Sequence, residues 1–369
     1  MKILHVISGG ESGGSKNHLL SLFKHNTKHE MFLLVFTKGA LYEEAVEQGI
    51  NVKVMEQKSR YDVSVLSRLK KFVNTNDFDI VHSHGGRANF MIRMIQGSLK
   101  AKWVTTVHSD PELDYIHNPK MKKVFTGLNK WSYAKVDHFF AVSKRFKEMI
   151  SGYGIPADKI STIYNGIDFS FVSQDITREE AGLNHADFTA MIVARLHPVK
   201  QHKMLLNAFK AFSVEHPEKA VSLVVVGEGQ LEQELKQLTA ELQLNEKVQF
   251  LGSRSDVPVL FRHADVSLLT SESESFPLVL LESAREKTPI ISTDVGGVAQ
   301  LIPENKGGWL IPIGDQDALT VALNEALLEK EAGTIEEKGQ FLYEYARKNF
   351  SLHALQQSIF NRYEKILRK

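Results

Sequence analysis

The sequence predicts an α/β protein with two doubly wound domains, each built on a sheet of parallel strands. Its 369 residues are enough for about two domains of ordinary size. Short runs rich in β-branched residues alternate with helical stretches along the first half of the chain, and the alternation starts again near residue 188. Strands separated by helices of this length form parallel sheets that are covered by helices on both faces.

The first domain is expected to span residues 1–168. Its expected strands are, in chain order, residues 2–8, 31–37, 51–56, 79–84, 103–109, 137–143 and 159–167. The expected helices between them are residues 16–26, 41–49, 63–76, 87–99 and 144–154. Gly49 ends the second of these helices, as glycine commonly does.

The second domain is expected to span residues 188–351, and residues 169–187 interrupt the pattern as a linker. Its expected strands are residues 188–196, 221–229, 247–252, 266–270, 289–294 and 307–313, and its expected helices are residues 204–216, 230–242 and 278–287. The amphipathic tail 352–369 is expected to be a helix that packs back onto the first domain. Ligands of open α/β sheets bind at the carboxyl ends of the strands. We therefore expect the two domains to face each other across a cleft.

The composition is that of a globular enzyme, with 43% hydrophobic and 24% charged residues and no cysteine. Disulfides and thiolate metal sites are thereby excluded. The first ten residues are too short for a signal peptide and no apolar run approaches a membrane span, which predicts a cytoplasmic protein. Up to Asp168 there are 24 Lys and Arg against 16 Asp and Glu, and thereafter 21 against 28. Either the charge drifts by chance over solvated faces, or the first domain meets an anionic surface.

The stretch SESESFPLVLLESA (271–284) places two carboxylates around the start of a helix. Glu274 is expected in the loop at the carboxyl end of a buried strand, and Glu282 in the second turn of the following helix. Pro277 suits an early helical position. The free N–H groups of the first helical turn would attract an anion. This arrangement suits a sugar nucleotide.

Two cations follow the first strand of the second domain. In VARLHPVK, Arg195 stands at the strand end and Lys200 at the start of the next helix. They are either solvated loop residues or a clamp for a diphosphate, which would neutralise charge on a leaving nucleoside diphosphate. The glycine loops at Gly227 and Gly296 are of the same strand-end type, and each is a weak signal alone.

The first domain offers a glycine loop and two histidines. GGESGGSK (9–16) lacks the lysine spacing of a nucleoside-triphosphatase loop, so it is either a tight turn or a backbone that approaches a ligand, which we favour. His84 and His108 both end strands, and at least one should face the cleft. A zinc pair has poor support because no nearby residue completes a tetrahedral site.

Taken together, these motifs resemble the retaining glycosyltransferases of family 4, which have the GT-B fold of two Rossmann-like domains. The motifs occur in the order GG loop, TVHS, YNGID, VARLxxxK, VVVGEG, FLG, the Glu pair and DVGG. The resemblance covers nearly the whole chain and is most specific in the C-terminal half. It implies a nucleotide-sugar donor, which we expect to be UDP-linked, in the C-terminal domain and an acceptor in the N-terminal domain.

The resemblance also implies roles for individual residues. Arg195 and Lys200 match the diphosphate-binding pair, Glu282 the acceptor of the ribose hydroxyls, Glu274 the reader of sugar hydroxyls and His108 the histidine beside the transferring sugar. The catalytic set implied is therefore His108, Glu274, Arg195 and Lys200. Further substrate contacts are implied for Gly13, Gly14, His84, Asn165, Gly227, Ser275 and the amides of Phe276, Pro277 and Leu278.

Such enzymes are thought to react on one face of the sugar, with the departing phosphate helping to deprotonate the acceptor. No enzyme nucleophile is therefore expected. No metal or other cofactor is expected either, because the cationic side chains and the helix dipole would take the role of a metal. Two positions depart from the family pattern: Ser275 replaces a glycine and restricts the backbone, and Gln300 replaces a glutamate and removes a charge. Neither departure touches the phosphate clamp.

Residues 115–136 contain five lysines and no acid, with Phe125, Trp131 and Tyr133 among them. This segment is either an ordinary exposed helix whose aromatic residues face the core, or an interfacial helix attracted to anionic lipid. The second reading favours a lipid-linked or glycan acceptor of the cell envelope and peripheral attachment to the plasma membrane. Nucleic acid fits less well because no recognition module accompanies the lysines.

Two other functions share this fold. A nucleotide-sugar 2-epimerase would need additional acid and base residues around the sugar and no acceptor site. A non-catalytic partner of an active glycosyltransferase could lose the functional residues, but Arg195, Lys200, Glu274 and Glu282 are all present. The four residues favour an active glycosyltransferase, and the resemblance implies that it retains the anomeric configuration and works without a metal.

Overall fold

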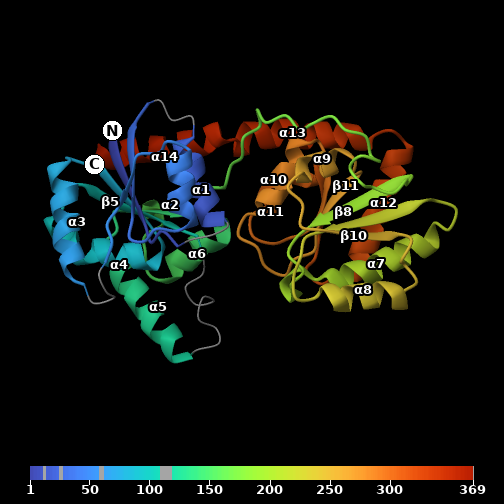
Figure 1. Cartoon of the computed structure of the whole chain (residues 1–369), viewed down its shortest axis with the longest axis horizontal. Helices are drawn as coiled ribbons and strands as arrows, with labels where there is room; N and C mark the ends of the chain where they lie inside the picture. Colours follow the sequence, from blue (N-terminus) through green and yellow to red (C-terminus); the bar gives the residue numbers. More distant parts are fainter. Residues whose placement is uncertain (11–13, 25–27, 58–61, 109–118, 369) are drawn as a thin grey trace. The chain divides into compact units, whose positions relative to one another are not determined.

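The computed structural model describes residues 1–10, 14–24, 28–57, 62–108 and 119–368, and the chain divides into two compact units (Figure 1). Unit 1 comprises Met1–Gly166 and Leu352–Lys369, and unit 2 comprises Ile167–Ser351. Each unit holds one sheet in which all paired strands are parallel, with helices packed on it. The predicted pair of doubly wound α/β units is confirmed.

The sheet of unit 1 has seven strands in the order β3-β2-β1-β4-β5-β6-β7. The strands are β1 (Lys2–Ile7), β2 (Glu30–Val35), β3 (Val52–Val54), β4 (Ile80–His84), β5 (Lys102–Val107), β6 (His138–Ala141) and β7 (Ile160–Thr162). The described helices are α1 (Gly14–Phe23), α2 (Ala40–Glu47), α3 (Ser64–Thr75), α4 (Gly85–Ile95), α5 (Pro119–Tyr133), α6 (Lys144–Gly152) and α14 (Leu352–Leu367), with short 3-10 turns at Gln96–Ser98 and Ala157–Lys159.

Alternate residues of β1 point to two separate hydrophobic cores. Leu4 and Val6 pack with residues of α3, α4 and α6 on one face. Ile3 and Ile7 pack on the other face with α1 and with Leu355, Ile359, Phe360 and Tyr363 of α14. The C-terminal helix therefore completes the core of unit 1. His5, between Leu4 and Val6, shares the face of Ile3 and Ile7 because side chains alternate along a strand.

The sheet of unit 2 has six strands in the order β10-β9-β8-β11-β12-β13. The strands are β8 (Phe188–Val193), β9 (Val221–Val226), β10 (Val248–Gly252), β11 (Val266–Leu269), β12 (Ile290–Thr293) and β13 (Gly308–Ile311). The described helices are α7 (His202–Glu215), α8 (Glu232–Glu241), α9 (Val257–Arg262), α10 (Leu278–Arg285), α11 (Val298–Leu301), α12 (Gln316–Glu331) and α13 (Ile335–Phe350), with 3-10 turns at Pro198–Lys200 and Pro303–Asn305.

Residues 169–187, expected to be a linker, belong to unit 2. Ala181 and Leu183 are buried in a cluster with residues of β8, β9 and α9. The guanidinium of Arg178 donates to the carbonyl oxygens of Asn184 and His263 and to Oγ1 of Thr189, at 2.6 to 2.8 Å. The polar composition of the segment suggested a solvated linker. Arg178 instead uses its several N–H donors to bind groups of the fold, so a polar residue holds the segment in place.

Both sheets reverse their strand order at one place, between β1 and β4 in unit 1 and between β8 and β11 in unit 2. In doubly wound folds this switch point is where ligands bind, beyond the carboxyl ends of the strands. A candidate residue that lies near the switch point of its own sheet is therefore better placed to bind a ligand than one that lies far from it. No helix of the described residues has the length and apolarity to cross a membrane.

Candidate functional site

In unit 2, the loops that follow β8 and β11 meet at the switch point. Nζ of Lys200, from the loop after β8, lies 2.5 Å from Oε1 of Glu274, from the loop after β11. Oγ of Ser271 donates to the same oxygen at 2.7 Å. Only 17% of the Lys200 side chain and 16% of the Glu274 side chain are exposed. Among the described residues, Oε2 of Glu274 has no partner and remains available to a ligand.

Backbone contacts tie these two loops together. Oγ1 of Thr270 donates to the carbonyl oxygen of Lys200 at 2.7 Å, and the N–H of Glu272 donates to the carbonyl oxygen of Val199 at 2.9 Å. Between them, Gln201 takes a left-handed conformation with φ of 55° before α7 begins. Such a conformation costs a non-glycine residue energy and is held by its surroundings. The backbone of Lys200 is therefore held in place by contacts with the loop after β11.

Gly296 supports the Glu274 loop from the far side. Its φ is +58°, and a Cβ at this position would lie 2.3 Å from the carbonyl oxygen of Ser275 and 2.6 Å from that of Glu274. Oγ1 of Thr293 donates to the carbonyl oxygen of Ser271 at 2.7 Å. The glycine of the DVGG motif is thus required for close backbone packing under Glu274.

Helix α10 begins directly after this loop. Phe276 is buried and packs against Phe350 with ring centroids 5.1 Å apart, and Pro277 is the N-cap. The amide role that the resemblance implies for Pro277 is therefore wrong, because proline has no N–H. Phe276 and Leu278 keep theirs. The first-turn N–H groups and the helix dipole favour an anion at this end of α10.

Glu282 lies in the second turn of α10, as the sequence predicts, and is half-buried. Burial raises the pKa of its carboxyl group, while Arg285 acts in the opposite direction. Among the described residues the side chain of Glu282 has no hydrogen-bond or ion-pair partner. A carboxylate held partly out of water without donors is suited to accept two hydroxyl groups from a ligand.

Arg195 follows β8 and is exposed. Its chain segment is packed closely against the next strand-end loop. A Cβ at Gly227, where φ is +132°, would lie 2.0 Å from the carbonyl oxygen of Ala194, and one at Gly229 would lie 2.4 Å from that of Leu196. Packing alone thus accounts for Gly227, to which the sequence assigns a substrate contact.

In unit 1, His108 follows β5 and lies at the edge of a cluster of histidines. Nε2 of His108 is 3.2 Å from Nδ1 of His84, and Nε2 of His84 is 3.0 Å from Nδ1 of His5. His82 stacks on His84 with ring centroids 4.2 Å apart. His18, from α1, meets the ring of His108 edge-on at 5.0 Å. β1 and β4, which carry His5, His82 and His84, flank the switch point of unit 1.

The structure corrects the prediction for His84. Its side chain is only 1% exposed and both ring nitrogens contact other histidines, so it lies behind His108 and not against a substrate. Asn165 is also buried, and its Oδ1 accepts a hydrogen bond from Nδ1 of His18 at 3.0 Å. Asn165 therefore acts on this cluster through His18.

The glycine loop of unit 1 is described only in part. Gly13 lies outside the described residues, and Gly14 is the first residue of α1. Lys16 forms an ion pair with Glu44 of α2. A Cβ at Gly9, where φ is +105°, would lie 2.2 Å from the carbonyl oxygen of Thr37, which explains that glycine by packing.

Burial keeps the histidine cluster uncharged. Desolvation lowers the pKa of His5 to about 3 and that of His18 to about 4, and it holds the pKa values of His82, His84 and His108 well below 6.5. The sequence reasoning missed His5, His18 and His82. The alternation of His82 and His84 along one strand was the available signal, because it places both rings on one face.

Nitrogen atoms of His5, His82 and His84 lie within 4.8 Å of one another, a spacing that a metal ion could bridge. The ring geometry works against this use. His82 already contacts Oγ1 of Thr106 at 2.7 Å and the hydroxyl of Tyr363 at 2.5 Å through its two nitrogens. The His82 and His84 rings are stacked, and their lone pairs, which lie in the ring planes, do not converge.

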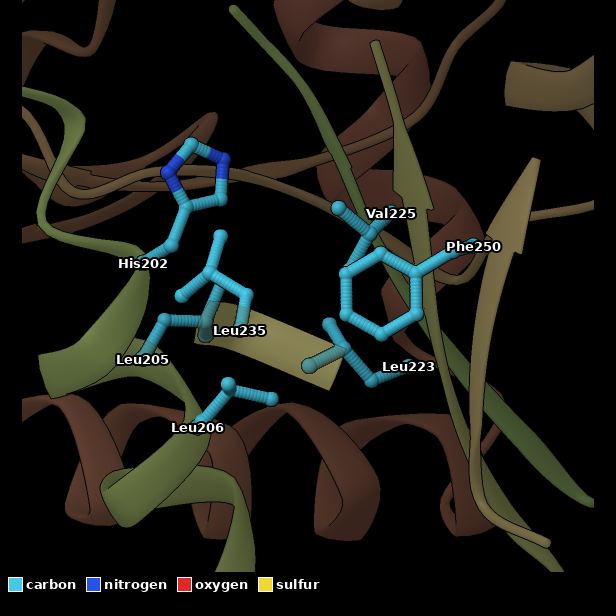
Figure 2. Close-up of a pocket in the computed structure, with 7 residues that line it drawn as sticks. All are labelled: His202, Leu205, Leu206, Leu223, Val225, Leu235 and Phe250. Carbon is cyan, nitrogen blue, oxygen red and sulfur yellow. The ribbon is translucent and has the colours of Figure 1, made fainter. Parts of the chain in front are cut away.

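A second buried histidine environment lies in unit 2 and is apolar. Figure 2 shows His202, at the start of α7, above a small space lined by Leu205, Leu206, Leu223, Val225, Leu235 and Phe250. The space does not admit a water molecule. Desolvation lowers the pKa of His202 to about 4, with Lys200 adding to the effect. This space belongs to the core and is not a ligand site.

Comparisons with known proteins identify the family and the fold of the chain. Residues 12–171 match the family model described as Glycosyltransferase Family 4, and residues 173–349 match the model described as Glycosyl transferases group 1. The chain is 27% identical over 292 residues to N-acetyl-alpha-D-glucosaminyl L-malate synthase of Bacillus anthracis, covering 77% of this chain and 74% of the relative.

Two further proteins are similar over most of their length. A Campylobacter jejuni enzyme, GalNAc-alpha-(1->4)-GalNAc-alpha-(1->3)-diNAcBac-PP-undecaprenol alpha-1,4-N-acetyl-D-galactosaminyltransferase, is 27% identical, covering 90% of this chain and 91% of the relative. The crystal structure of Anabaena Alr3699/HepE in complex with UDP superposes with a TM-score of 0.83 at 21% identity, covering 99% and 100% of the two chains. The chain belongs to the group 1 glycosyltransferases of family 4 and has the GT-B fold.

Proposed function

We propose that this glycosyltransferase transfers a sugar from a UDP-sugar to a lipid-linked or glycan acceptor of the cell envelope, with retention of the anomeric configuration and without a bound metal. The observation that carries the donor part is Glu282. A half-buried carboxylate with a raised pKa and no hydrogen-bond or ion-pair partner among the described residues gains most from a ligand that donates two hydroxyl groups, and a ribose does this.

The surroundings of Glu282 suit the rest of such a donor. The amino-terminal end of α10 and the ammonium of Lys200 provide positive potential for a diphosphate without a metal ion. Oε2 of Glu274 can accept a sugar hydroxyl while Oε1 stays bound to Lys200 and Ser271. The solved UDP complex of Alr3699/HepE supports the choice of UDP by analogy of fold.

In this proposal the enzyme positions the donor and stabilises the leaving UDP, and it forms no covalent intermediate. The bond between the anomeric carbon and the diphosphate oxygen breaks as the acceptor oxygen bonds to the same face. The acceptor proton passes to the departing phosphate, which balances the charge. Lys200, Arg195 and the α10 amides would stabilise the negative charge that develops on the leaving group.

The donor site is tested with Glu282→Ala and Lys200→Ala, and with Leu328→Ala as a control. Leu328 is 60% exposed on α12 and takes no part in the proposed site. Each site variant should lower either the affinity for UDP, measured by calorimetry, or the rate of sugar transfer. The expected loss is at least tenfold, which corresponds to about 1.4 kcal/mol. The control should match the wild type. Unchanged binding and turnover in both site variants would contradict the proposal.

Two further measurements address the remaining parts of the proposal. Proton NMR of the first-formed product should show the same anomeric configuration as the donor, and the opposite configuration would reject retention. Transfer should persist after treatment with a chelator. Loss of activity that only a divalent ion restores would reject the metal-free mechanism.

An exposed face of unit 1 supports contact with a membrane-bound acceptor. This α4–α5 face contains Phe90, Met94, Leu128 and Trp131, which are 36 to 51% exposed. The guanidinium of Arg93 lies over the Trp131 ring at 4.4 Å. Figure 1 shows α5 projecting from the body of unit 1. Tyr133, in contrast, is buried against Phe139 in the core.

Apolar side chains among cations are typical of surfaces that bind anionic lipid. Lys123, Lys130 and Lys135 of the basic segment are exposed, and residues 115–118 lie outside the described residues. We expect the protein to sediment with vesicles that contain anionic lipid and to be released by salt. The double variant Phe90→Ser with Trp131→Ser should abolish sedimentation, while Leu328→Ser should not. Membrane contact through this face would be rejected if the protein sedimented equally with neutral vesicles. It would also be rejected if the protein sedimented with neither kind of vesicle.

A further inference from the structure

We infer that His5 and His84 are positioning residues that determine which nitrogen of His108 carries a proton. The three imidazoles form one line of hydrogen bonds from the interior of unit 1 to His108, a residue of intermediate burial. We call this line the histidine relay. Its consequence for sugar transfer depends on the proposed function, whereas its existence does not.

The ring geometry is that of two aligned hydrogen bonds. The N···N distances are 3.0 Å for His5–His84 and 3.2 Å for His84–His108. The planes of neighbouring rings differ by only 25° and 27°. Because imidazole lone pairs and N–H bonds lie in the ring plane, nearly coplanar rings at these distances can each donate to the next.

Each ring of the relay is neutral and so carries a single N–H. Two proton arrangements are then consistent with both hydrogen bonds. In the outward arrangement Nδ1 of His5 donates to His84, Nδ1 of His84 donates to His108, and Nδ1 of His108 presents an N–H to a ligand. In the inward arrangement every bond is reversed, and Nδ1 of His108 presents a lone pair.

The buried end of the relay favours the outward arrangement. Nε2 of His5 is buried and has no hydrogen-bond partner. The inward arrangement would place an N–H on this atom, and a buried N–H without an acceptor is the rarer and costlier defect. The outward arrangement leaves only an unpaired lone pair there. His108 is thereby fixed as a hydrogen-bond donor through Nδ1.

Neighbouring side chains hold the relay in place. His82 stacks on His84 and is fixed by Thr106 and by the hydroxyl of Tyr363 from α14. A rotation of the His84 ring would break this stack and both relay bonds. The N–H of His108 can then donate to an oxygen of a ligand bound to unit 1, and no proton needs to be taken up or lost.

NMR of the protein with 15N-labelled histidine tests the relay directly. Nδ1 of His5, His84 and His108 should each have the shift of a protonated nitrogen, and each Nε2 that of an unprotonated one. Coupling between nitrogens across both hydrogen bonds should be visible. The reverse pattern at His108, or the absence of coupling, would overturn the proposal without any variant or any substrate.

Variants at position 5 separate positioning from general stability. Asn at position 5 can donate its amide to Nε2 of His84, so His5→Asn should keep the protonated Nδ1 of His108. His5→Leu removes the donor, and the Nδ1 signal of His108 should move towards the unprotonated shift. His138→Asn is the control, because His138 is also buried in the same sheet, with 3% of it exposed, and contacts Ser161 outside the relay. It should leave the His108 signals unchanged.

The same variants connect the relay to transfer. kcat should fall about tenfold in His5→Leu, recover in His5→Asn and stay near the wild-type value in His138→Asn. An unaltered His108 spectrum in folded His5→Leu would overturn the relay. The wild-type protein could give the expected His108 spectrum and still transfer no sugar. That result would support the relay and reject the proposed function.

Discussion

Gly296 shows at the scale of single residues how the fold protects Glu274. Its backbone conformation is left-handed, and the carbonyl oxygens of Ser275 and Glu274 occupy the space that a side chain would need. Two costs therefore apply to a substitution there. One is the strain of the positive φ, and the other is a displacement of the Glu274 backbone.

Gly296→Ala should lower the transfer rate at least tenfold because it moves Glu274. Gly314→Ala is a matched control: Gly314 has φ of +76° but nothing lies within 4 Å of its Cβ position. Both variants should lose about 1 kcal/mol of stability from backbone strain, measured by urea denaturation. Only Gly296→Ala should lose activity. Equal activity in the two variants would show that the Glu274 loop tolerates the displacement.

At the same scale, the sequence located the residues of unit 2 better than those of unit 1. Lys200 and Glu274 stand in polar loops at strand ends, so their motifs were visible, and the structure brings them into contact. His5 stands alone within an apolar strand and gave no such signal, and the one signal for His82 was its alternation with His84 along β4. The partner of His82, Tyr363, is 281 residues away, and a contact of that range cannot be inferred from local pattern.

At the scale of elements, strands were easier to predict than the later helices. All six residues of β9 are buried, and such a continuous apolar run is the mark of a central parallel strand. Helices α12 and α13 were not predicted. The buried positions of α12 (Leu319, Thr320, Ala322, Leu323, Ala326 and Leu327) cover a wide face. They do not form the narrow stripe by which an amphipathic helix is recognised.

Helix α14 is the element that joins the far end of the chain to the relay. Its apolar residues complete the core on the face of β1 that carries His5, and its Tyr363 fixes His82. Burial raises the pKa of Tyr363 well above 10, so its hydroxyl keeps the proton and can donate to His82. A helix at the end of the sequence is thus part of the support of His108.

At the scale of the whole molecule, the two units differ in how many buried histidines they contain. Of the described residues, His5, His18, His82 and His84 of unit 1 are at most 2% exposed, whereas unit 2 has His202 at the same level. In each case burial lowers the pKa below the 6.5 of an unfolded chain. The folded state therefore binds fewer protons than the unfolded state at mildly acidic pH.

Acidification should therefore destabilise unit 1 first. Stability falls as pH drops below 6.5, where the unfolded histidines take up protons, and it continues to fall towards pH 4 and 3, where His18 and His5 titrate in the folded state. Between pH 7 and 5.5 each of these histidines costs about 1 kcal/mol. His108 adds to the four of unit 1 because its pKa is also held well below 6.5, which gives about 5 kcal/mol for unit 1 and about 1 for unit 2.

Tryptophan fluorescence can measure the two units separately during urea denaturation. Trp309→Phe leaves Trp103 and Trp131 in unit 1, and the pair Trp103→Phe with Trp131→Phe leaves Trp309 in unit 2. The unit 1 transition should move to lower urea as pH falls from 7 to 5.5, by several times more than the unit 2 transition. His5→Asn should remove about one proton from the uptake on unfolding of unit 1, because one titrating group is gone. Equal shifts in both units would mean that the buried histidines are already protonated in the folded protein, and a neutral relay could not then exist.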